Sequence, residues 1–304
     1  MASEYPPKIL LLGKNGQIGQ ELQRSLSPLG EVIACGRADI NFEDSANLRS
    51  RLREIGPEII VNAAAYTAVD KAESDAERAY QVNAEAVRVL ADAAAHSGAL
   101  LLHYSSEYVF DGEKKTSYTE TDAPRPLSVY GASKLAGEEA IRGSGCDHLI
   151  FRTTWIFSPR GHNFAKTILR LAGERDHLQV VDDQVGAPTS AVLVAEVTAW
   201  CLRRVLESGQ RAAAASLFGT YHLTASGKIS RYGYAQYLIR RTLEKGAQSK
   251  LNADAIEPVS ASDYAVPAKR PANSTLATDK ICQAFDLSLP DWRVGVDQLL
   301  DEIL

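Results

Sequence analysis

Short apolar runs alternate with amphipathic segments through the first half of the chain. Residues Lys8–Leu12 form an apolar run that ends at a glycine, which is typical of a buried parallel strand. Leu22, Leu26 and Leu29 then recur at helical spacing, and a long alanine-rich helix is predicted over 75–96. Further strands are predicted at 31–35, 58–61, 99–104 and 146–151. This alternation predicts an α/β fold with a doubly wound, Rossmann-like parallel sheet.

The strand and helix pattern becomes less regular beyond Trp155. Helices are predicted at 163–173, 191–208, 231–245 and 292–303, with short strands at 177–181 and 220–224. We therefore predict a first domain at residues 1–155 and a second, smaller α/β domain at 156–304, some of whose elements pack back onto the first sheet. Trp200 and Trp292 lie on predicted helices and are expected in the core.

Composition and charge narrow the possible partners. The 304 residues are 45% hydrophobic and 23% charged, as in an ordinary soluble protein. A net charge of −5 gives no reason to expect nucleic acid or an anionic membrane as a partner. The four cysteines are far apart in sequence, which indicates free thiols in a reducing compartment. Residues 1–7 lack the basic and apolar pattern of a secretory leader, so we expect a cytoplasmic protein.

A glycine-rich turn follows the first predicted strand and precedes a predicted helix. Gly13, Gly16 and Gly19 are spaced three residues apart, one residue different from the common dinucleotide fingerprint. Such glycines can mark a tight turn alone, but this position favours a pyrophosphate site made by backbone N–H groups and the helix N-terminus. Gln17 and Ile18, within the same turn, are further candidate cofactor contacts.

The residues after the second and third strands suggest which cofactor is bound. No acid ends the second strand, and Arg37 is available there for a 2′-phosphate, which favours NADPH, with NADH as the alternative. Arg37 as a solvated loop residue is the competing interpretation. Asp39 and Ile40 are placed to flank the adenine ring. Small residues after the third strand allow a cofactor to approach closely on the nicotinamide side: Ala63, Ala64 and Ala65.

The candidate chemistry lies at Ser106, Tyr130 and Lys134. Tyr130 and Lys134 are four residues apart on a predicted helix, so their side chains share one face. A nearby ammonium lowers the pKa of a phenol from its ordinary value near 10, which suits the phenol to proton transfer. Ser106 ends the fourth strand and offers a hydroxyl to a substrate carbonyl oxygen. These three residues predict a reductase site.

Seven segments resemble the extended short-chain dehydrogenase/reductase superfamily and, within it, the dTDP-4-dehydrorhamnose reductases. The glycine turn and the Tyr–Lys pair occur across the superfamily, whereas the blocks at 62–73 and 183–189 are more specific. The segments are 13–19, 62–73, 108–112, 130–138, 152–157, 183–189 and 270–274.

The resemblance implies that a hydride from NADPH or NADH reduces the C4 ketone of dTDP-4-dehydro-6-deoxy-L-mannose to dTDP-L-rhamnose. It implies that Tyr130 donates the proton, that Lys134 lowers the pKa of Tyr130 and holds the nicotinamide ribose, and that Ser106 binds the carbonyl oxygen. The second domain is then the substrate domain. The candidate substrate contacts are Thr67, Val69, Ser106, Glu107, Trp155 and Arg270.

The sequence departs from the family pattern at two places. Ser106-Glu107 stands where the family usually has Thr-Asp; Ser106 keeps the hydroxyl, and we expect the longer Glu107 to alter contacts to the sugar. Some relatives hold Mg²⁺ between subunits with three glutamates, of which this chain matches Glu21 and Glu302 but has Val192 at the third place. We therefore expect no structural metal, and either a monomer or a homodimer.

Other interpretations of the site stay open. Arg270 is a candidate for the substrate diphosphate or for a local ion pair. The same scaffold also serves reductases of other deoxysugar nucleotides and epimerases. A non-catalytic regulatory role is a further alternative, because the beta subunit of methionine adenosyltransferase shares the resemblance. The joint presence of Ser106, Tyr130 and Lys134 argues against that role.

Overall fold

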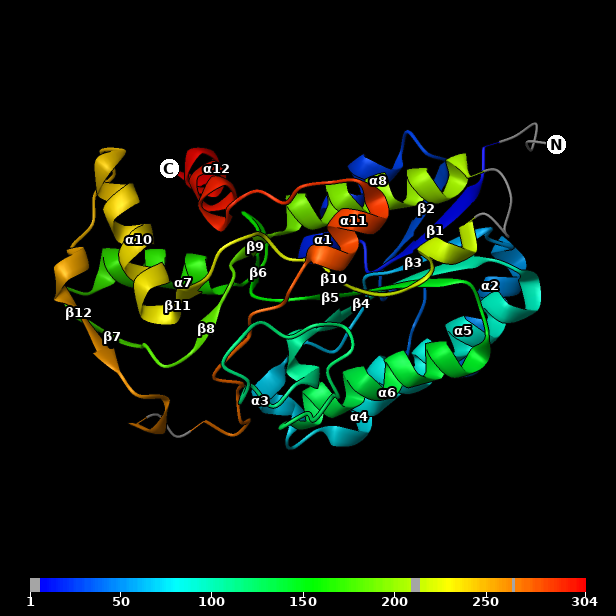
Figure 1. Ribbon diagram of the computed structural model, residues 1–304, viewed down its shortest axis with the longest axis horizontal. Coiled ribbons are helices and arrows are strands. Elements are labelled where there is room, and N and C mark those ends of the chain that lie inside the picture. Colours follow the sequence, from blue (N-terminus) through cyan, green and yellow to red (C-terminus); the bar gives the residue numbers. More distant parts are fainter. Residues whose placement is uncertain (1–5, 209–213, 264–265) are drawn as a thin grey trace.

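The computed structural model describes residues 6–208, 214–263 and 266–304. Part of the N-terminal segment considered as a leader, residues 1–5, lies outside them. A six-stranded, wholly parallel sheet has the strand order β10-β5-β4-β3-β1-β2, which confirms the predicted doubly wound fold (Figure 1). Its strands are β1 (Lys8–Leu12), β2 (Glu31–Cys35), β3 (Ile59–Asn62), β4 (Leu100–Ser106), β5 (His148–Thr153) and β10 (Gly219–His222).

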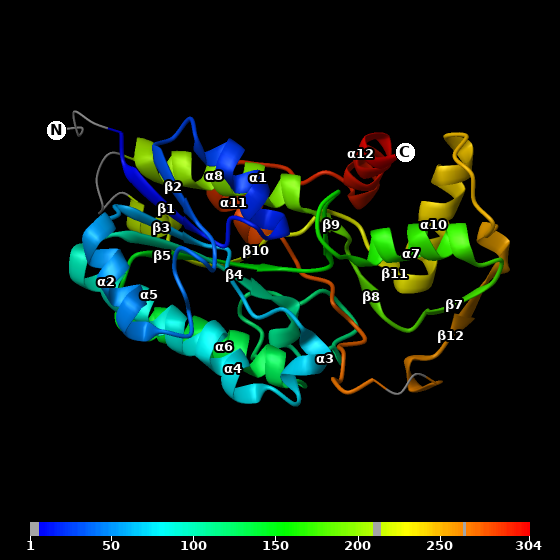
Figure 2. The ribbon, with the colours of Figure 1, turned by 180° about the vertical axis from the view of Figure 1, so that it is seen from behind.

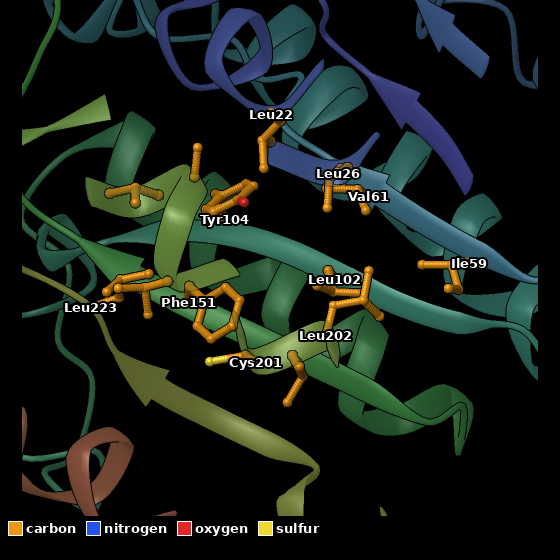
Figure 3. Packing of buried hydrophobic residues seen from close by; sticks show 14 of the residues in the cluster. Leu22, Leu26, Ile59, Val61, Leu102, Tyr104, Phe151, Cys201, Leu202 and Leu223 are labelled. Carbon is orange, nitrogen blue, oxygen red and sulfur yellow. The ribbon is translucent and has the colours of Figure 1, made fainter. Parts of the chain in front are cut away.

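Helices cover both faces of this sheet, so the central parts of its strands are largely apolar, and polar side chains gather toward the carboxyl ends of β4 and β5. One face packs on α1, α8 and α11, and the other on α2, α5 and α6, as the two opposite views show (Figures 1 and 2). Figure 3 shows how Leu22 and Leu26 of α1 face Val61 and Leu102 of the sheet within the first core. These helices are α1 (Gln17–Leu26), α2 (Ser45–Ile55), α5 (Ala86–Ser97), α6 (Val129–Ser144), α8 (Ala191–Glu207) and α11 (Asp279–Phe285).

The helix predicted over 75–96 contains a wide π turn. It consists of α4 (Ala76–Tyr80), the π turn Gln81–Glu85 and α5. The turn carries Asn83, whose Oδ1 accepts from the Tyr66 N–H at 2.9 Å, while its Nδ2 donates to Ser133 Oγ at 3.0 Å. The π turn thereby joins the loop after β3 to α6.

A second, smaller unit lies beyond the carboxyl ends of the sheet strands (Figure 1). Trp292, at the start of α12, is buried in the core of this unit, as predicted. The prediction for Trp200 is wrong: it is 44% exposed, because Val194, Val197 and Cys201 form the inward face of α8. The elements of this part are α7 (Phe164–Glu174), α10 (Arg231–Glu244), α12 (Trp292–Ile303), β6 (Ile156–Phe157), β7 (Leu178–Val181), β8 (Val185–Gly186), β9 (Thr189–Ser190), β11 (Ile229–Ser230) and β12 (Ile256–Val259).

Candidate active site

A cavity of about 1030 Å³ opens at the carboxyl ends of the sheet strands. The strand order reverses at β1, which pairs with β2 on one side and β3 on the other, and ligands bind at such switch points in open α/β sheets. Most of the predicted site residues line this cavity, and Gly19 and Asp39 do not. Those that line it are Gly13, Gly16, Gln17, Ile18, Arg37, Ile40, Ala63, Ala64, Ala65, Thr67, Val69, Ser106, Glu107, Tyr130, Lys134, Trp155 and Arg270.

The glycine turn leaves the N-terminus of α1 open toward the cavity. Gly16 precedes α1 and provides no side-chain cap, so the first N–H groups of the helix remain for a ligand. A β-carbon on Gly13, whose φ is +86°, would lie 2.6 Å from the Ala64 nitrogen. One on Gly19 would lie 2.1 Å from the Gly13 carbonyl oxygen, so Gly19 supports the turn from beneath. This bare backbone cradle fits the pyrophosphate of a dinucleotide.

The residues after β2 form ion pairs at the rim of the cavity. Asp39 accepts from the Gly36 N–H at 2.8 Å and pairs with Lys14 at 2.7 Å, which holds the pKa of Asp39 below its ordinary value. Asp39 is therefore turned toward Lys14 rather than into the cavity. Arg37, predicted to be available for a phosphate, contacts Glu43.

Tyr130 and Lys134 lie one turn apart on α6, which Ser128 caps by accepting from the Gly131 N–H at 3.1 Å. Lys134 is 2% exposed and donates to the Tyr104 carbonyl oxygen at 2.6 Å, and its Nζ lies 3.3 Å from Nε2 of buried His103. Burial lowers the pKa of Lys134 to about 8. The lysine is therefore poised to change its charge near neutral pH.

Ser106 and Glu107 interact with each other directly. The Ser106 hydroxyl donates to Glu107 Oε2 at 2.5 Å, and Thr154 Oγ1 donates to Glu107 Oε1 at 2.8 Å. The carboxyl group of Glu107 is buried, and burial raises its pKa. Glu107, considered above as a sugar contact, is thus engaged in fixing the hydroxyls of Ser106 and Thr154.

The structure corrects one part of the electrostatic argument. Lys134 was expected to lower the pKa of Tyr130, but burial and then the Glu107 carboxylate raise it above its ordinary value, while Ser106 opposes them by hydrogen bonding. The physical reason is that Lys134 Nζ is directed at the Tyr104 carbonyl oxygen. A phenol with a raised pKa keeps its proton at neutral pH, which is the state required of an acid that protonates an alkoxide.

Two arginines enter the cavity from the later part of the chain. Arg270 forms an ion pair with Asp70 at 2.7 Å, which is the local ion pair considered as one of its two possible roles. The Arg231 guanidinium lies 3.6 Å from the centre of the Trp155 ring, and burial lowers its pKa to about 10. Trp155 has a left-handed φ of +47°, and Gly186 packs against the ring, where a β-carbon would come within 2.6 Å. Sequence reasoning missed Arg231 because no local motif connects it to Trp155.

Neither a metal cluster nor a membrane segment is found in the described parts of the chain. Within residues 6–208, 214–263 and 266–304, no three His, Cys, Asp or Glu side chains are grouped to hold a metal ion. Among the same residues, no helix is both long enough and apolar enough to span a bilayer.

The parallel sheet, the glycine turn at its switch point and the Ser, Tyr and Lys side chains at its carboxyl edge define a protein of the short-chain dehydrogenase/reductase class. The family model described as RmlD substrate binding domain matches residues 7–304, and the chain belongs to this family. The resemblance noted in the sequence is therefore confirmed.

Named relatives of the chain agree with this assignment. The dTDP-4-dehydrorhamnose reductase of Escherichia coli (strain K12) is 47% identical over 303 residues, with 97% of each chain covered. A crystal structure of a dTDP-4-dehydrorhamnose reductase from Clostridium acetobutylicum is 34% identical, with a TM-score of 0.86 and coverage of 97% of this chain and 99% of that one. The Bacillus anthracis reductase, solved in complex with NADP, is 31% identical, with a TM-score of 0.84 and coverage of 98% and 99%.

Proposed function

We propose that this protein reduces the C4 ketone of dTDP-4-dehydro-6-deoxy-L-mannose to dTDP-L-rhamnose, with NADPH preferred as the hydride donor and NADH as a possible alternative. The observation that carries the proposal is the convergence of Ser106, Tyr130 and Lys134 on one cavity with the open N-terminus of α1. The names of the full-length relatives support the same substrate.

The cofactor is proposed to lie across the switch point of the sheet. The N-terminal N–H groups of α1 receive the pyrophosphate, and Ala63, Ala64 and Ala65 border the nicotinamide half. Lys134 reaches the nicotinamide ribose from α6. When bound, the reduced nicotinamide supplies the hydride. The residues of this chain orient the ketone and supply the proton.

Proton transfer is assigned to Tyr130. Because burial and Glu107 raise the pKa of Tyr130, the phenol is protonated at neutral pH and delivers its proton to the oxygen at C4 as the hydride arrives. Glu107 fixes the Ser106 hydroxyl next to this phenol. In this proposal the Ser106 hydroxyl exchanges its hydrogen bond to Glu107 for one to the carbonyl oxygen when the ketone binds, and Glu107 acts as a positioning residue.

The nucleotide sugar is proposed to enter from the side of the second unit, which we assign as the substrate domain. Its elements come from residues 156–304, apart from α8, β10 and α11, which pack on the first sheet. Thr67, Val69 and Trp155 line the cavity, and we propose that they contact the sugar. Arg231 and Arg270 are the proposed contacts of the diphosphate, since a guanidinium binds phosphate oxygens through two parallel hydrogen bonds. We further propose a cytoplasmic enzyme that acts as a monomer or homodimer.

The test is the loss of NADPH absorbance when the purified protein meets dTDP-4-dehydro-6-deoxy-L-mannose. A Tyr130→Phe variant should lose about 10²- to 10⁴-fold in kcat, the usual contribution of a positioned acid. It should keep its affinity for NADP⁺ within about threefold, because the phenol oxygen alone is removed. Wild-type protein that binds NADPH but leaves the ketosugar unreduced would refute the proposed substrate. Product analysis would separate reduction from epimerisation, which consumes no external reductant.

A further inference from the structure

One carboxylate oxygen at the rim of the cavity binds two arginines. Glu43 Oε1 contacts Nη2 of Arg37, and it accepts from Arg78 Nη2 at 2.9 Å and from Arg78 Nε at 3.1 Å. Arg37 follows β2 and Arg78 lies on α4, so Glu43 joins the loop after β2 to α4. All three residues line it. The glutamate is held in place because its backbone N–H donates to Asn41 Oδ1 at 3.0 Å.

The charges at this rim are unevenly matched. Lys14 is paired with Asp39 at 2.7 Å, whereas Arg37 and Arg78 share Glu43 as their carboxylate. The Arg37 side chain is 69% exposed, and those of Glu43 and Arg78 are about one-third exposed. Water therefore screens these ion pairs, and an incoming anion can compete for the guanidinium groups. The group of Arg37, Glu43 and Arg78 is left with one excess positive charge.

In dinucleotide folds the adenosine ribose lies past the carboxyl end of the second strand, which here is β2. This inference rests on the proposed nucleotide binding. A 2′-phosphate at that place brings close to two negative charges and favours two guanidinium partners. The Glu43 carboxylate already holds the guanidinium donors that this phosphate would need. With an unphosphorylated ribose there is no such conflict, and a carboxylate is a suitable acceptor for ribose hydroxyls.

We propose that Glu43 sets the discrimination between NADPH and NADH by competing with the 2′-phosphate for Arg37 and Arg78. Arg37 and Arg78 make the site accept the phosphorylated cofactor. Glu43 limits that preference, so the site retains affinity for the unphosphorylated cofactor. Sequence inspection at the end of β2 identifies Arg37 alone, because Glu43 and Arg78 reach it only through the fold.

The test compares adenosine 2′,5′-bisphosphate with AMP by calorimetric titration of the full-length protein. NADP⁺ and NAD⁺ are titrated in parallel. In Glu43→Gln, the ratio of the AMP dissociation constant to the bisphosphate dissociation constant should rise roughly 3- to 30-fold, as expected when two surface ion pairs are released. The matched control is Glu85→Gln, because Glu85 forms an exposed pair with Arg88 and does not line the cavity. Its ratio should stay within about twofold of wild type.

A second variant set tests the cause of the change. In an Arg37→Gln, Arg78→Gln background, adding Glu43→Gln should leave the ratio within about twofold, because the shared donors are gone. If the ratio of the AMP to the bisphosphate dissociation constant is unchanged or lower in the single Glu43→Gln variant, the inference is overturned. It is also overturned if Glu43→Gln still raises this ratio when both arginines have been replaced. These titrations do not use the sugar-nucleotide substrate. A result that overturns the role of Glu43 therefore leaves the proposed reduction of the ketosugar untouched. Absence of any nucleotide binding by wild type would overturn both proposals.

Discussion

Glu138 provides a matched comparison of a buried and an exposed ion pair that share one carboxylate. It lies on α6, the helix that carries Tyr130 and Lys134, and its side chain is fully buried. Arg152 of β5, which is 3% exposed, donates to Oε1 at 2.8 Å and to Oε2 at 2.6 Å. Arg142, which is 39% exposed, donates to Oε2 at 3.0 Å from one turn further along α6. The buried pair therefore anchors the proposed catalytic helix to the sheet.

Replacing the two arginines should have very different effects on stability. Arg152→Met leaves a buried carboxylate without its main partner, which should cost about 3 to 5 kcal/mol in free energy of unfolding. Arg142→Met removes an exposed pair and should cost at most about 1 kcal/mol. With a urea dependence on the order of 3 kcal/mol per M, the midpoint should fall by about 1 M or more for Arg152→Met and by less than about 0.3 M for Arg142→Met.

The pH dependence of this difference follows from the pKa of Glu138. Burial alone would raise it, but the hydrogen bonds and charge of Arg152 lower it below its ordinary value. A lowered folded-state pKa gives a contribution that is fully present above the unfolded pKa, near 4.3, and is lost as the pH falls through the folded value. The difference in free energy of unfolding between Arg152→Met and wild type should therefore become smaller in acid.

The assay is urea unfolding followed by tryptophan fluorescence at pH 7 and at about pH 3. A Glu138→Gln, Arg152→Met double variant should recover much of the loss, because it removes the unpaired charge. Equal midpoint shifts for Arg152→Met and Arg142→Met, or a gap that does not change with pH, would show that the buried pair is not the anchor inferred here.

Three further outcomes test the site. Gly19→Ala should weaken NADP⁺ binding about tenfold or more in titration, because the new β-carbon would push against the Gly13 carbonyl oxygen. The control is Gly143→Ala, where a β-carbon has open space; it should leave binding unchanged and stabilise α6 by about 0.5 to 1 kcal/mol. Gly186→Ala should displace the Trp155 ring and raise the KM for the sugar nucleotide about tenfold, with NADP⁺ affinity within twofold; an unchanged KM would contradict that packing. Because burial lowers the pKa of Lys134 to about 8, kcat/KM should fall as the pH rises through 8, and a profile flat to pH 10 would contradict this assignment.

Local sequence patterns predicted the strands of the parallel sheet well. Lys8–Leu12 and Glu31–Cys35 were predicted with the bounds that the structure has, because buried parallel strands are nearly continuous apolar runs. Trp200 was misplaced because α8 is apolar over much of its surface, so its pattern alone does not identify the inward face. The π turn in the long helix also leaves no simple mark in the periodicity.

The sequence could name candidate site residues but not their partners. The spacing of Tyr130 and Lys134 placed both on one helix face, yet it could not show that Lys134 is directed at a carbonyl of β4. The stacking of Arg231 on Trp155 joins residues from distant parts of the chain, and no local pattern reports such a contact. These contacts depend on tertiary packing, which a single sequence does not display.

The return of β10 and α11 to the first sheet has a consequence for synthesis of the chain. β10 pairs with β5, and Ile281 and Phe285 of α11 complete the core that contains Ile9. A nascent chain that has reached residue 155 still lacks the 130 residues up to Phe285. At about 5 to 20 residues per second, the edge of β5 stays unpaired for roughly 3 to 13 seconds until His222 is made, and the first core is completed by α11 only after roughly 6 to 26 seconds. During that interval the unpaired edge of β5 and the incomplete core leave the growing chain prone to aggregation.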